Sequence, residues 1–290
     1  MKKYLIKWFI DENFHDKPFF FVSLRKITEA NSENMENILS TYNLFLIAMA
    51  VVALLVFLAL QFFEAGYGYL FDSRYGKPIP NKVGWVLMES PVFILMCMLW
   101  GVSPRQLDAV QLVLFAMFQL HYFQRSFIFP LLMRGESKMP LGIVVMGMVF
   151  NSLNALMQGG WIFYLAPADY YADWFAKPYI WIGAVVFFAG MAVNLHSDHI
   201  IRNLRKPGDK RHYIPMGGMF KYVSSANYFG ELLEWTGFAI ASWSWAGAVF
   251  VLWTFANLAP RSASLYKRYE KEFGEEFTSL KRKRIIPFIY

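Results

Sequence analysis

The sequence predicts an all-α polytopic membrane protein with seven transmembrane helices. Two observations lead to this fold class. The chain of 290 residues is 57% hydrophobic and only 17% charged, a balance that soluble domains of this size seldom show. Its apolar runs also reach the ~20 residues that an α-helix, rising about 1.5 Å per residue, needs to cross a hydrocarbon core of about 30 Å.

Five apolar runs each supply one predicted span. They are Leu44–Phe63, Val83–Trp100, Ala109–Met133, Leu141–Leu165 and Ile180–Leu195. The last run, Tyr228–Pro260, is too long for one span and too short for two spans with a free loop. A tight turn at Ser242, Trp243 and Ser244 divides it into two, so seven spans are favoured over six.

Residues 1–43 precede the first span and carry lysines interleaved with aromatic residues. Lys7 and Asp11 interrupt their apolar segment too early for a signal-peptide core of about 7–15 residues. Such a mixture suits a segment whose apolar side enters the lipid headgroup region, whereas it is a poor nucleic-acid surface. We therefore expect an interfacial extension over 1–43 and one membrane domain over 44–290.

Basic residues gather in Arg202–Arg211 and again after Pro260. Short basic loops mark the cytoplasmic face, since lysine and arginine resist translocation. With seven spans, both clusters share a side with Arg134–Lys138 and lie opposite Ala166–Lys177. This topology places the N-terminal lysines outside, a conflict that stays open. Contact with anionic lipid is an alternative role for the clusters.

Several kinds of site are not expected. The single cysteine, Cys97, permits neither a disulfide nor a cysteine-based metal site within one chain. The chain has no GxGxxG or Walker-type GxxxxGK[ST] motif, so a nucleotide would use neither a Rossmann nor a P-loop cradle. HExxH and GxSxG motifs are also missing from the sequence, and we predict no catalytic metal.

Ionisable side chains inside predicted spans are the first candidate site residues, because a charge in the bilayer is costly unless it is paired or hydrated. Glu89 lies in the second span, close to Pro91, which can kink the helix. His121 and Arg125 lie one turn apart in the third span, beside Tyr122. An ion pair between helices and ordinary core packing are the alternative interpretations.

Two polar stripes follow nearer the C-terminus. Asn194, Asp198 and Arg202 recur every four residues and lead into the basic loop, which favours a phosphate-bearing cofactor that enters from the cytoplasm. Residues 227, 231 and 234 (Asn, Glu and Glu) lie on one side of the sixth span. Pairing of these carboxylates with nearby arginines is the alternative, and it is compatible with cofactor binding.

Five motifs carry a resemblance to a known family. They are His121-Tyr-Phe-Gln-Arg-Ser-Phe, Asn194-Leu-His-Ser-Asp, Leu204-Arg-Lys-Pro-Gly, Asn227-Tyr-Phe-Gly-Glu-Leu-Leu-Glu-Trp and Ile286-Pro-Phe-Ile-Tyr. Their order and intervals over residues 44–290 resemble the steroid 5α-reductase family (3-oxo-5α-steroid 4-dehydrogenases), most closely its type 2-like members. Two alternatives are an isoprenylcysteine-type membrane methyltransferase, whose Arg-His-Pro motif is missing here, and a lipid transporter, for which no internal repeat is present.

The resemblance implies seven helices around a cavity for NADPH and substrate, with hydride transfer to the β-carbon of a 3-oxo-Δ4 steroid such as testosterone or progesterone. Glu89 and Tyr122 would be catalytic, because a tyrosine donor oriented by Glu89 can stabilise the enolate that forms on the ketone oxygen. Tyr75 and Trp85 would line the substrate pocket. Residues 44–165 would form the substrate side and 178–290 the NADPH side.

The family positions that bind NADPH also map onto this sequence. They are His121, Arg125, Asn194, Asp198, Arg205, Asn227, Glu231, Arg261 and Tyr269. Arginines would take phosphates, while asparagines and carboxylates would take the amide and the ribose hydroxyls. We expect a monomer in the bacterial inner membrane, or in the endoplasmic reticulum if the source is eukaryotic, with the NADPH site and the C-terminus facing the cytoplasm.

Overall fold

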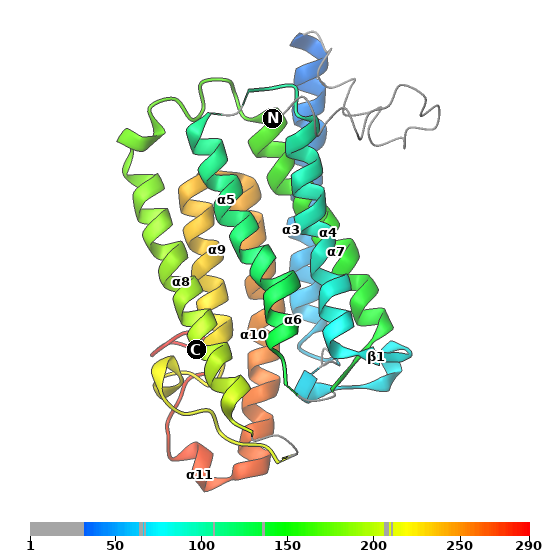
Figure 1. Cartoon of the computed structure of the whole chain (residues 1–290), viewed down its shortest axis with the longest axis vertical. Helices are drawn as coiled ribbons and strands as arrows, with labels where there is room; N and C mark the ends of the chain where they lie inside the picture. The colour runs from blue at the N-terminus through cyan, green and yellow to red at the C-terminus, as the bar shows by residue number, and fades with distance from the viewer. Residues whose placement is uncertain are drawn as a thin grey trace.

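The computed structural model describes residues 32–63, 66, 68–106, 108–134, 137–205, 209 and 211–290. Long helices run side by side through the whole length of the molecule (Figure 1). They are α3 (Ser32–Ala59), α4 (Asn81–Val102), α5 (Ala109–Phe123), α7 (Leu141–Gly160), α8 (Pro178–Asn203), α9 (Ala226–Ser242) and α10 (Trp245–Phe273). The short helices α6 (Phe129–Leu132) and α11 (Glu275–Thr278) complete the α-helical set among these residues.

Four helical segments in the described part of the chain are long and apolar enough to cross a bilayer. They are Met35–Ala59, Asn81–Val102, Leu141–Leu165 and Pro178–Asn203. The all-α membrane class is therefore confirmed, while the seven-span arrangement stays a prediction. The other long helices do not meet this measure of length and apolarity. Helix α5 has only 15 residues and α9 has 17, whereas the second half of α10 is rich in charge.

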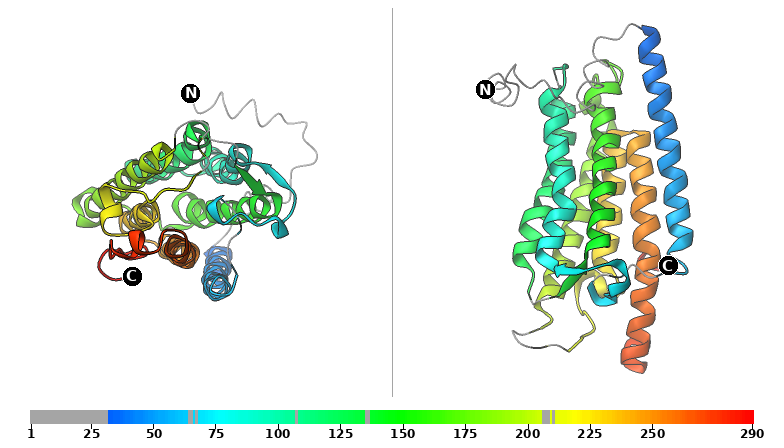
Figure 2. Two further views of the ribbon diagram at one scale, coloured as in Figure 1. Left: turned by 90° about the horizontal axis from the view of Figure 1, so that it is seen from below. Right: turned by 90° about the vertical axis from the view of Figure 1, so that its right-hand side faces the viewer.

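The first helix starts earlier than the apolar run suggests. We expected the membrane domain to begin at Leu44, but α3 begins at Ser32. The predicted interfacial extension lies outside the described residues over 1–31. Tyr42 belongs to α3, where its hydroxyl donates to Met157 O of α7 at 2.6 Å. Trp253 Nε1 of α10 donates to Met49 O at 2.8 Å, so α3 packs alongside both helices (Figure 2).

A small antiparallel ribbon departs from an entirely helical fold. Strand β1 (Pro78–Pro80) pairs with β2 (Lys138–Pro140), with Ile79 opposite Met139. Proline at three of these six positions is tolerated because each strand uses only one edge for pairing. The ribbon ends where α4 and α7 begin, so it fixes the starts of these two helices side by side.

The predicted tight turn between the last two long helices is confirmed. Helix α9 ends at Ser242, and Trp243 takes a left-handed conformation with φ of 47°. Ser244 then caps α10, since its Oγ accepts a hydrogen bond from Gly247 N at 3.0 Å. This reversal places α9 and α10 antiparallel and returns the chain towards the basic end of the bundle.

Helices α8 and α9 approach each other through glycine. A Cβ on Gly190 would lie 2.3 Å from Glu234 N, and one on Gly230 would lie 2.4 Å from Asn194 N. Gly183 and Gly237 make equivalent backbone contacts one heptad further along each helix. Small residues at a membrane helix interface allow such close backbone packing. The contact places the polar stripes of α8 and α9 next to each other.

Candidate active site

A cavity of about 1050 Å³ lies between the helices. Residues of α3, α4, α5, α7, α8, α9 and α10 line it. The structure brings together at this cavity all the predicted site residues except Tyr75 and Asn194. Those that line it are Trp85, Glu89, His121, Tyr122, Arg125, Asp198, Arg205, Asn227, Glu231, Arg261 and Tyr269.

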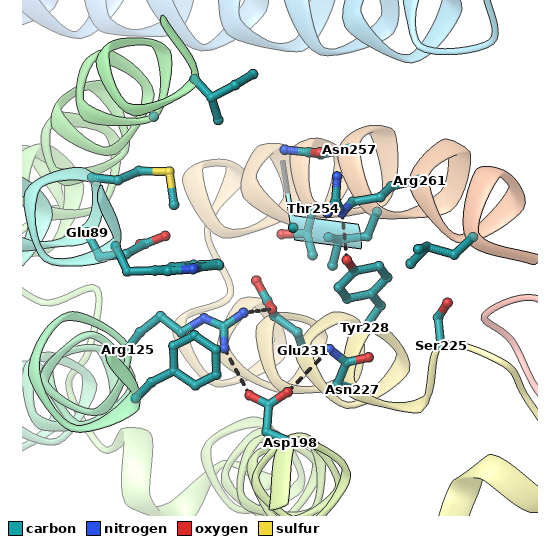
Figure 3. Close-up of a pocket in the computed structure, with 18 of the residues that line it drawn as sticks. Glu89, Arg125, Asp198, Ser225, Asn227, Tyr228, Glu231, Thr254, Asn257 and Arg261 are labelled. Carbon is teal, nitrogen blue, oxygen red and sulfur yellow. Dashed lines mark hydrogen bonds and ion pairs between the residues drawn. The ribbon is translucent and has the colours of Figure 1, made fainter. Parts of the chain in front are cut away.

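Arg125 is the centre of a charged cluster in this cavity. Its Nη1 donates to Asp198 Oδ2 at 3.0 Å, and its Nη2 donates to Glu231 Oε2 at 3.4 Å. Asn227 Nδ2 donates to the other oxygen of Asp198 at 3.3 Å (Figure 3). The guanidinium is 7% exposed, and a buried charge requires such partners. The cluster joins the third predicted span to α8 and α9.

A change of helix type positions Arg125. The chain leaves α5 at Phe123 and makes one π-helical turn over Gln124–Ile128, in which Phe129 N donates to Gln124 O. The Arg125 guanidinium lies over Phe129 at 4.5 Å and over Trp85 at 4.7 Å from the ring centroids. Single π turns occur frequently at functional sites. Sequence periodicity did not indicate this turn.

Asn194 lies behind the cavity wall. Its Nδ2 donates to the backbone oxygen of Asn227 at 2.9 Å. It is buried at the glycine contact of α8 and α9, where Gly230 packs against its backbone. Asn194 therefore supports the residue that lines the cavity, and we correct its predicted position from the lining to the layer behind it.

Tyr75 also lies away from the cavity. It ends a short 3₁₀ turn over Ser73–Tyr75 and packs beside Trp85 on a cluster that contains Met88 and Met139. Its backbone oxygen lies 2.4 Å from where a Cβ of Gly142 would be. The loop is thus fixed against the start of α7, and the Tyr75 ring lies beside Gly66, 2.5 Å from the position of a Cβ there. Of the predicted substrate pair, Trp85 alone reaches the cavity.

Two asparagines of α7 contact the predicted catalytic pair. Asn154 Nδ2 donates to Tyr122 Oη at 3.0 Å, and Asn151 Nδ2 donates to Glu89 Oε2 at 3.1 Å. The sequence led us to expect Glu89 to orient Tyr122 directly. Among the described residues, the partner of the Tyr122 hydroxyl is Asn154 instead. The Glu89 carboxyl and the Tyr122 hydroxyl both line the cavity, and each is hydrogen-bonded to its own asparagine of α7.

His121 has a partner in the same region. Its Nδ1 lies 2.8 Å from Glu234 Oε1, and both side chains are buried. Glu234 does not line the cavity, whereas Glu231, three residues earlier, does. The two carboxylates of α9 are therefore paired, Glu234 with His121 and Glu231 with Arg125. Only Glu231 has the expected arginine partner, and it lines the cavity as well.

A second set of polar residues lines the cavity along α10. Arg261 Nε donates to Tyr228 Oη at 2.6 Å, and both side chains line the cavity (Figure 3). Thr254 and Asn257 line it from the same face of α10. We did not predict these two residues, although their spacing from Arg261 is helical and supplied a usable signal. Ser225 lines the cavity as well, and its buried Oγ has no partner among the described residues.

The loop after α8 contributes His212 and Tyr213 to the lining. This loop lies outside the predicted membrane spans. Hydrogen bonds from the Arg211 side chain and from the Tyr213 hydroxyl hold the pKa of Asp209 well below its usual range. In its ionised form Asp209 thus contacts Arg211 and Tyr213, the second of which lines the cavity.

Comparisons with known proteins identify the family of this chain. The family model described as 3-oxo-5-alpha-steroid 4-dehydrogenase matches residues 137–290. The human 3-oxo-5-alpha-steroid 4-dehydrogenase 1 is 43% identical over 215 residues, which cover 73% of this chain and 81% of the relative. The type 2 enzyme of Sus scrofa is 38% identical over 245 residues, covering 83% and 94%.

A plant relative extends the match over more of the chain. Steroid 5-alpha-reductase DET2 of Solanum lycopersicum is 35% identical over 257 residues, which cover 86% of this chain and 97% of the relative. The match therefore includes both the cavity-lining helices before residue 137 and the family-model region after it. The chain belongs to the 3-oxo-5-alpha-steroid 4-dehydrogenase family and is an oxidoreductase.

Proposed function

We propose that the protein uses NADPH to reduce the Δ4 double bond of 3-oxo-Δ4 steroids to 5α-dihydro products. One observation carries this proposal. A single cavity contains arginines suited to phosphates near the basic loop and, among apolar residues, the Tyr122 and Glu89 side chains suited to a ketone. The names of the relatives, which refer to 3-oxo-5-alpha-steroid dehydrogenation and steroid 5-alpha-reduction, support the substrate class.

The dimensions and donors of the cavity fit a nicotinamide dinucleotide together with a lipophilic substrate. Pockets for one drug-sized ligand measure about 300–1,000 Å³, so the observed 1050 Å³ suits a large ligand or two. The unpartnered Ser225 Oγ is a buried polar atom that a ligand would satisfy. Asn227 and Tyr228, the next residues of α9, add polar groups at the same wall.

We assign the binding roles from these contacts. Arg205 and Arg261 take phosphates, because guanidinium forks match phosphate oxygens. Arg125 is already paired with Asp198 and Glu231, so it fixes these carboxylates for the ribose and amide groups. His121, Asn227 and Tyr269 complete the predicted cofactor contacts, and Asn194 supports Asn227 from behind.

When bound by these residues, NADPH would supply a hydride to the β-carbon of the enone. Negative charge then develops on the ketone oxygen, and the Tyr122 hydroxyl donates a hydrogen bond to it in a buried environment, where such a donor is most effective. Glu89 contacts the same end of the substrate. Trp85 and Phe129 exclude water from this wall. The enolate finally takes one proton at its α-carbon, which completes the reduction.

We also propose that seven spans surround the cavity, since each long helix contributes to its lining. The basic loop and the C-terminus face the cytoplasm, where NADPH is available, and the protein acts as a monomer in the bacterial inner membrane or the endoplasmic reticulum. Family membership favours the reductase over the methyltransferase and transporter alternatives.

The test is NADPH oxidation by detergent-purified protein with testosterone or progesterone, with identification of the steroid product. We expect a 5α-dihydro product. Tyr122→Phe should lower kcat by roughly 10²–10³-fold, the usual cost of removing an oxyanion donor, and Glu89→Gln should lower it less. Binding of several enones without any NADPH oxidation would contradict the proposal.

A further inference from the structure

A chain of three buried polar side chains ends at Tyr122. Gln158 Nε2 donates to the backbone oxygen of Ala246 at 3.0 Å and lies 3.4 Å from Asn154 Oδ1. Asn154 Nδ2 lies 3.0 Å from Tyr122 Oη. Asn154 and Gln158 are 0% and 1% exposed, and neither lines the cavity. They are therefore placed to act on Tyr122 from behind and not on a ligand.

The orientation of both amides follows from one acceptor. Side-chain amide oxygen and nitrogen are assigned from the hydrogen-bond network. The Ala246 carbonyl can only accept, so the Gln158 nitrogen must face it. The second hydrogen of that nitrogen then faces Asn154, which must present its oxygen. This leaves the Asn154 nitrogen facing Tyr122.

The opposite orientation loses the hydrogen bond to the Ala246 carbonyl, which can only accept. Turning Gln158 over would place its oxygen against the Ala246 oxygen at about the same separation. Turning only Asn154 would oppose two NH₂ groups and would place its oxygen at Tyr122. Gln158 Oε1 has no partner among the described residues, but turning the amide over exchanges that unsatisfied atom for two opposed oxygens, which costs more in a buried site.

The polarity of Tyr122 follows from this chain. A phenol has one proton and can also accept, and its oxygen already accepts from Asn154. No described residue accepts the Tyr122 proton. Resting on the proposed function, we infer that Gln158 and Asn154 are positioning residues that direct the Tyr122 proton into the cavity, towards the ketone oxygen of a 3-oxo steroid. Accepting a hydrogen bond also makes the phenol a stronger donor.

Glu89 has a separate support that provides an internal comparison. Asn151 Nδ2 donates to Met88 O at 2.7 Å and to Glu89 Oε2 at 3.1 Å. A backbone acceptor again fixes the amide, and its second hydrogen is directed at the catalytic group. Among the described residues, the Asn151 side chain donates to Met88 O and Glu89 and not to Tyr122, so a change at Asn151 should affect Glu89 only.

The first experiment removes each member of the chain. Asn154→Leu keeps the side-chain size and should lower kcat about tenfold while KM for the enone and NADPH changes little, since the lost interaction acts in the transition state. Gln158→Leu should lower kcat by about threefold, because Asn154 then loses its own constraint. Ser152→Ala is the control on the same helix, since Ser152 Oγ donates only to Met148 O and lies outside the lining.

A double-mutant cycle distinguishes positioning from general damage. In the Tyr122→Phe background, Asn154→Leu should have almost no further effect on kcat, because its target is gone. An equal loss in both backgrounds would refute the relay. If Tyr122→Phe itself turns over like the wild type, the proposed role of Tyr122 fails instead, so the two failures are distinguishable.

Asn154→Asp supplies a second readout. A carboxylate at this position accepts the Tyr122 proton and turns it away from the ketone, so kcat should approach that of Tyr122→Phe at neutral pH. As the pH falls and the carboxyl takes up a proton, it can donate again, and activity should recover relative to the wild type at the same pH. Glu89, Glu231 and the Arg125 guanidinium also face this region, and the His121–Glu234 pair lies beside Tyr122. All of these groups are common to both proteins. Parallel pH profiles would overturn the inference.

A spectroscopic measurement needs no turnover. With NADP⁺ in the site, the C=O stretch of bound testosterone should shift to lower frequency in the wild type and in Ser152→Ala. The shift should shrink in Asn154→Leu and vanish in Tyr122→Phe. A full shift in Asn154→Leu would show that Tyr122 donates without Asn154 and would reject the relay.

Discussion

The α8–α9 pair and the α4–α7 pair form opposite walls of the cavity, and they are packed in different ways. At α8–α9 the nearest atoms to a Cβ on Gly190 are backbone atoms of Glu234, the closest at 2.3 Å. At α4–α7 the nearest atoms to a Cβ on Gly147 belong to the Met88 side chain, the closest at 2.2 Å. At α8–α9 two backbones are in direct contact, whereas at α4–α7 the flexible Met88 side chain lies between the helices.

This difference matches the proposed division of the cavity. A nucleotide cofactor is the same molecule in every turnover, and the α8–α9 wall presents its groups from a backbone contact that cannot adjust. In the proposed function the α4–α7 wall meets the steroid, and methionine side chains can move to follow the shape of a ligand. We therefore expect precise cofactor geometry on one side and tolerance of related enones on the other.

The largest effect should come from adding one methyl group at each interface. Gly190→Ala must separate two backbones, so it should cost more than the ~1–3 kcal/mol of ordinary overpacking. Gly147→Ala moves only the Met88 side chain and should cost less. Gly101→Ala is the control, since nothing lies within 4 Å of its Cβ position. Thermal unfolding in detergent measures all three, and equal midpoints for Gly190→Ala and Gly147→Ala would remove the distinction.

Arg125→Lys tests the charged cluster at the α8–α9 wall, which is the proposed cofactor wall. Lysine cannot contact Asp198 and Glu231 in the planar, two-branched way of a guanidinium, and it stacks less well on Trp85. We expect KM for NADPH to rise about tenfold, with a smaller change for the steroid. Arg134→Lys is the control, because Arg134 is exposed at the cavity edge. Equal effects of the two variants would contradict the assigned role of Arg125.

Trp85→Leu tests the opposite wall. Trp85 meets the ring of Phe129 edge-on with centroids 5.1 Å apart. Its loss should raise KM for testosterone by about fivefold, because an aromatic contact of this kind adds about 0.5–1.5 kcal/mol to the area it buries. KM for NADPH should rise less than twofold through the neighbouring Arg125. A larger effect on NADPH than on steroid would mean that the two walls are not separable.

The smallest effect concerns the residues around Asp209, after α8. Asp209→Asn removes a carboxylate that the exposed Arg211 and the half-buried Tyr213 contact, so KM for NADPH should rise by no more than about twofold. The pKa of Asp209 is lowered in the folded protein. Its contribution is therefore complete at neutral pH and disappears only as the pH falls through that lowered value. A tenfold rise at pH 7 would show that the loop belongs to the cofactor wall.

The cofactor wall was the easier one to predict from sequence. Asn194, Asp198 and Arg202 recur at helical spacing, which aligns them without any knowledge of a neighbour. Helical spacing also indicated the stripe on α9, and in the structure Asp198 and Glu231 meet at Arg125. Even so, the motif did not distinguish Asn194, one layer behind, from the residues that line the cavity.

The α4–α7 wall, which is the proposed substrate wall, depends on contacts that sequence spacing does not encode. Asn151, Asn154 and Gln158 stand in an apolar run at helical spacing, but their acceptors lie on other helices and include backbone oxygens. Tyr75 was misplaced because the path of its loop follows from packing on Gly142. The β1–β2 ribbon was missed because proline is disfavoured in strands and gives no strand signal.

The π turn over Gln124–Ile128 has a consequence for how this helix tolerates changes in length. A π turn closes a hydrogen bond five residues apart, here from Phe129 N to Gln124 O, so it holds one residue more than an α-helical turn. Deleting one residue there would restore ordinary α-helical geometry and leave the chain after the turn in register. The same deletion within Ala109–Phe123 would rotate everything that follows by about 100°, since an α-helix has 3.6 residues per turn. Single-residue deletions should therefore be tolerated better at the π turn than elsewhere in this span.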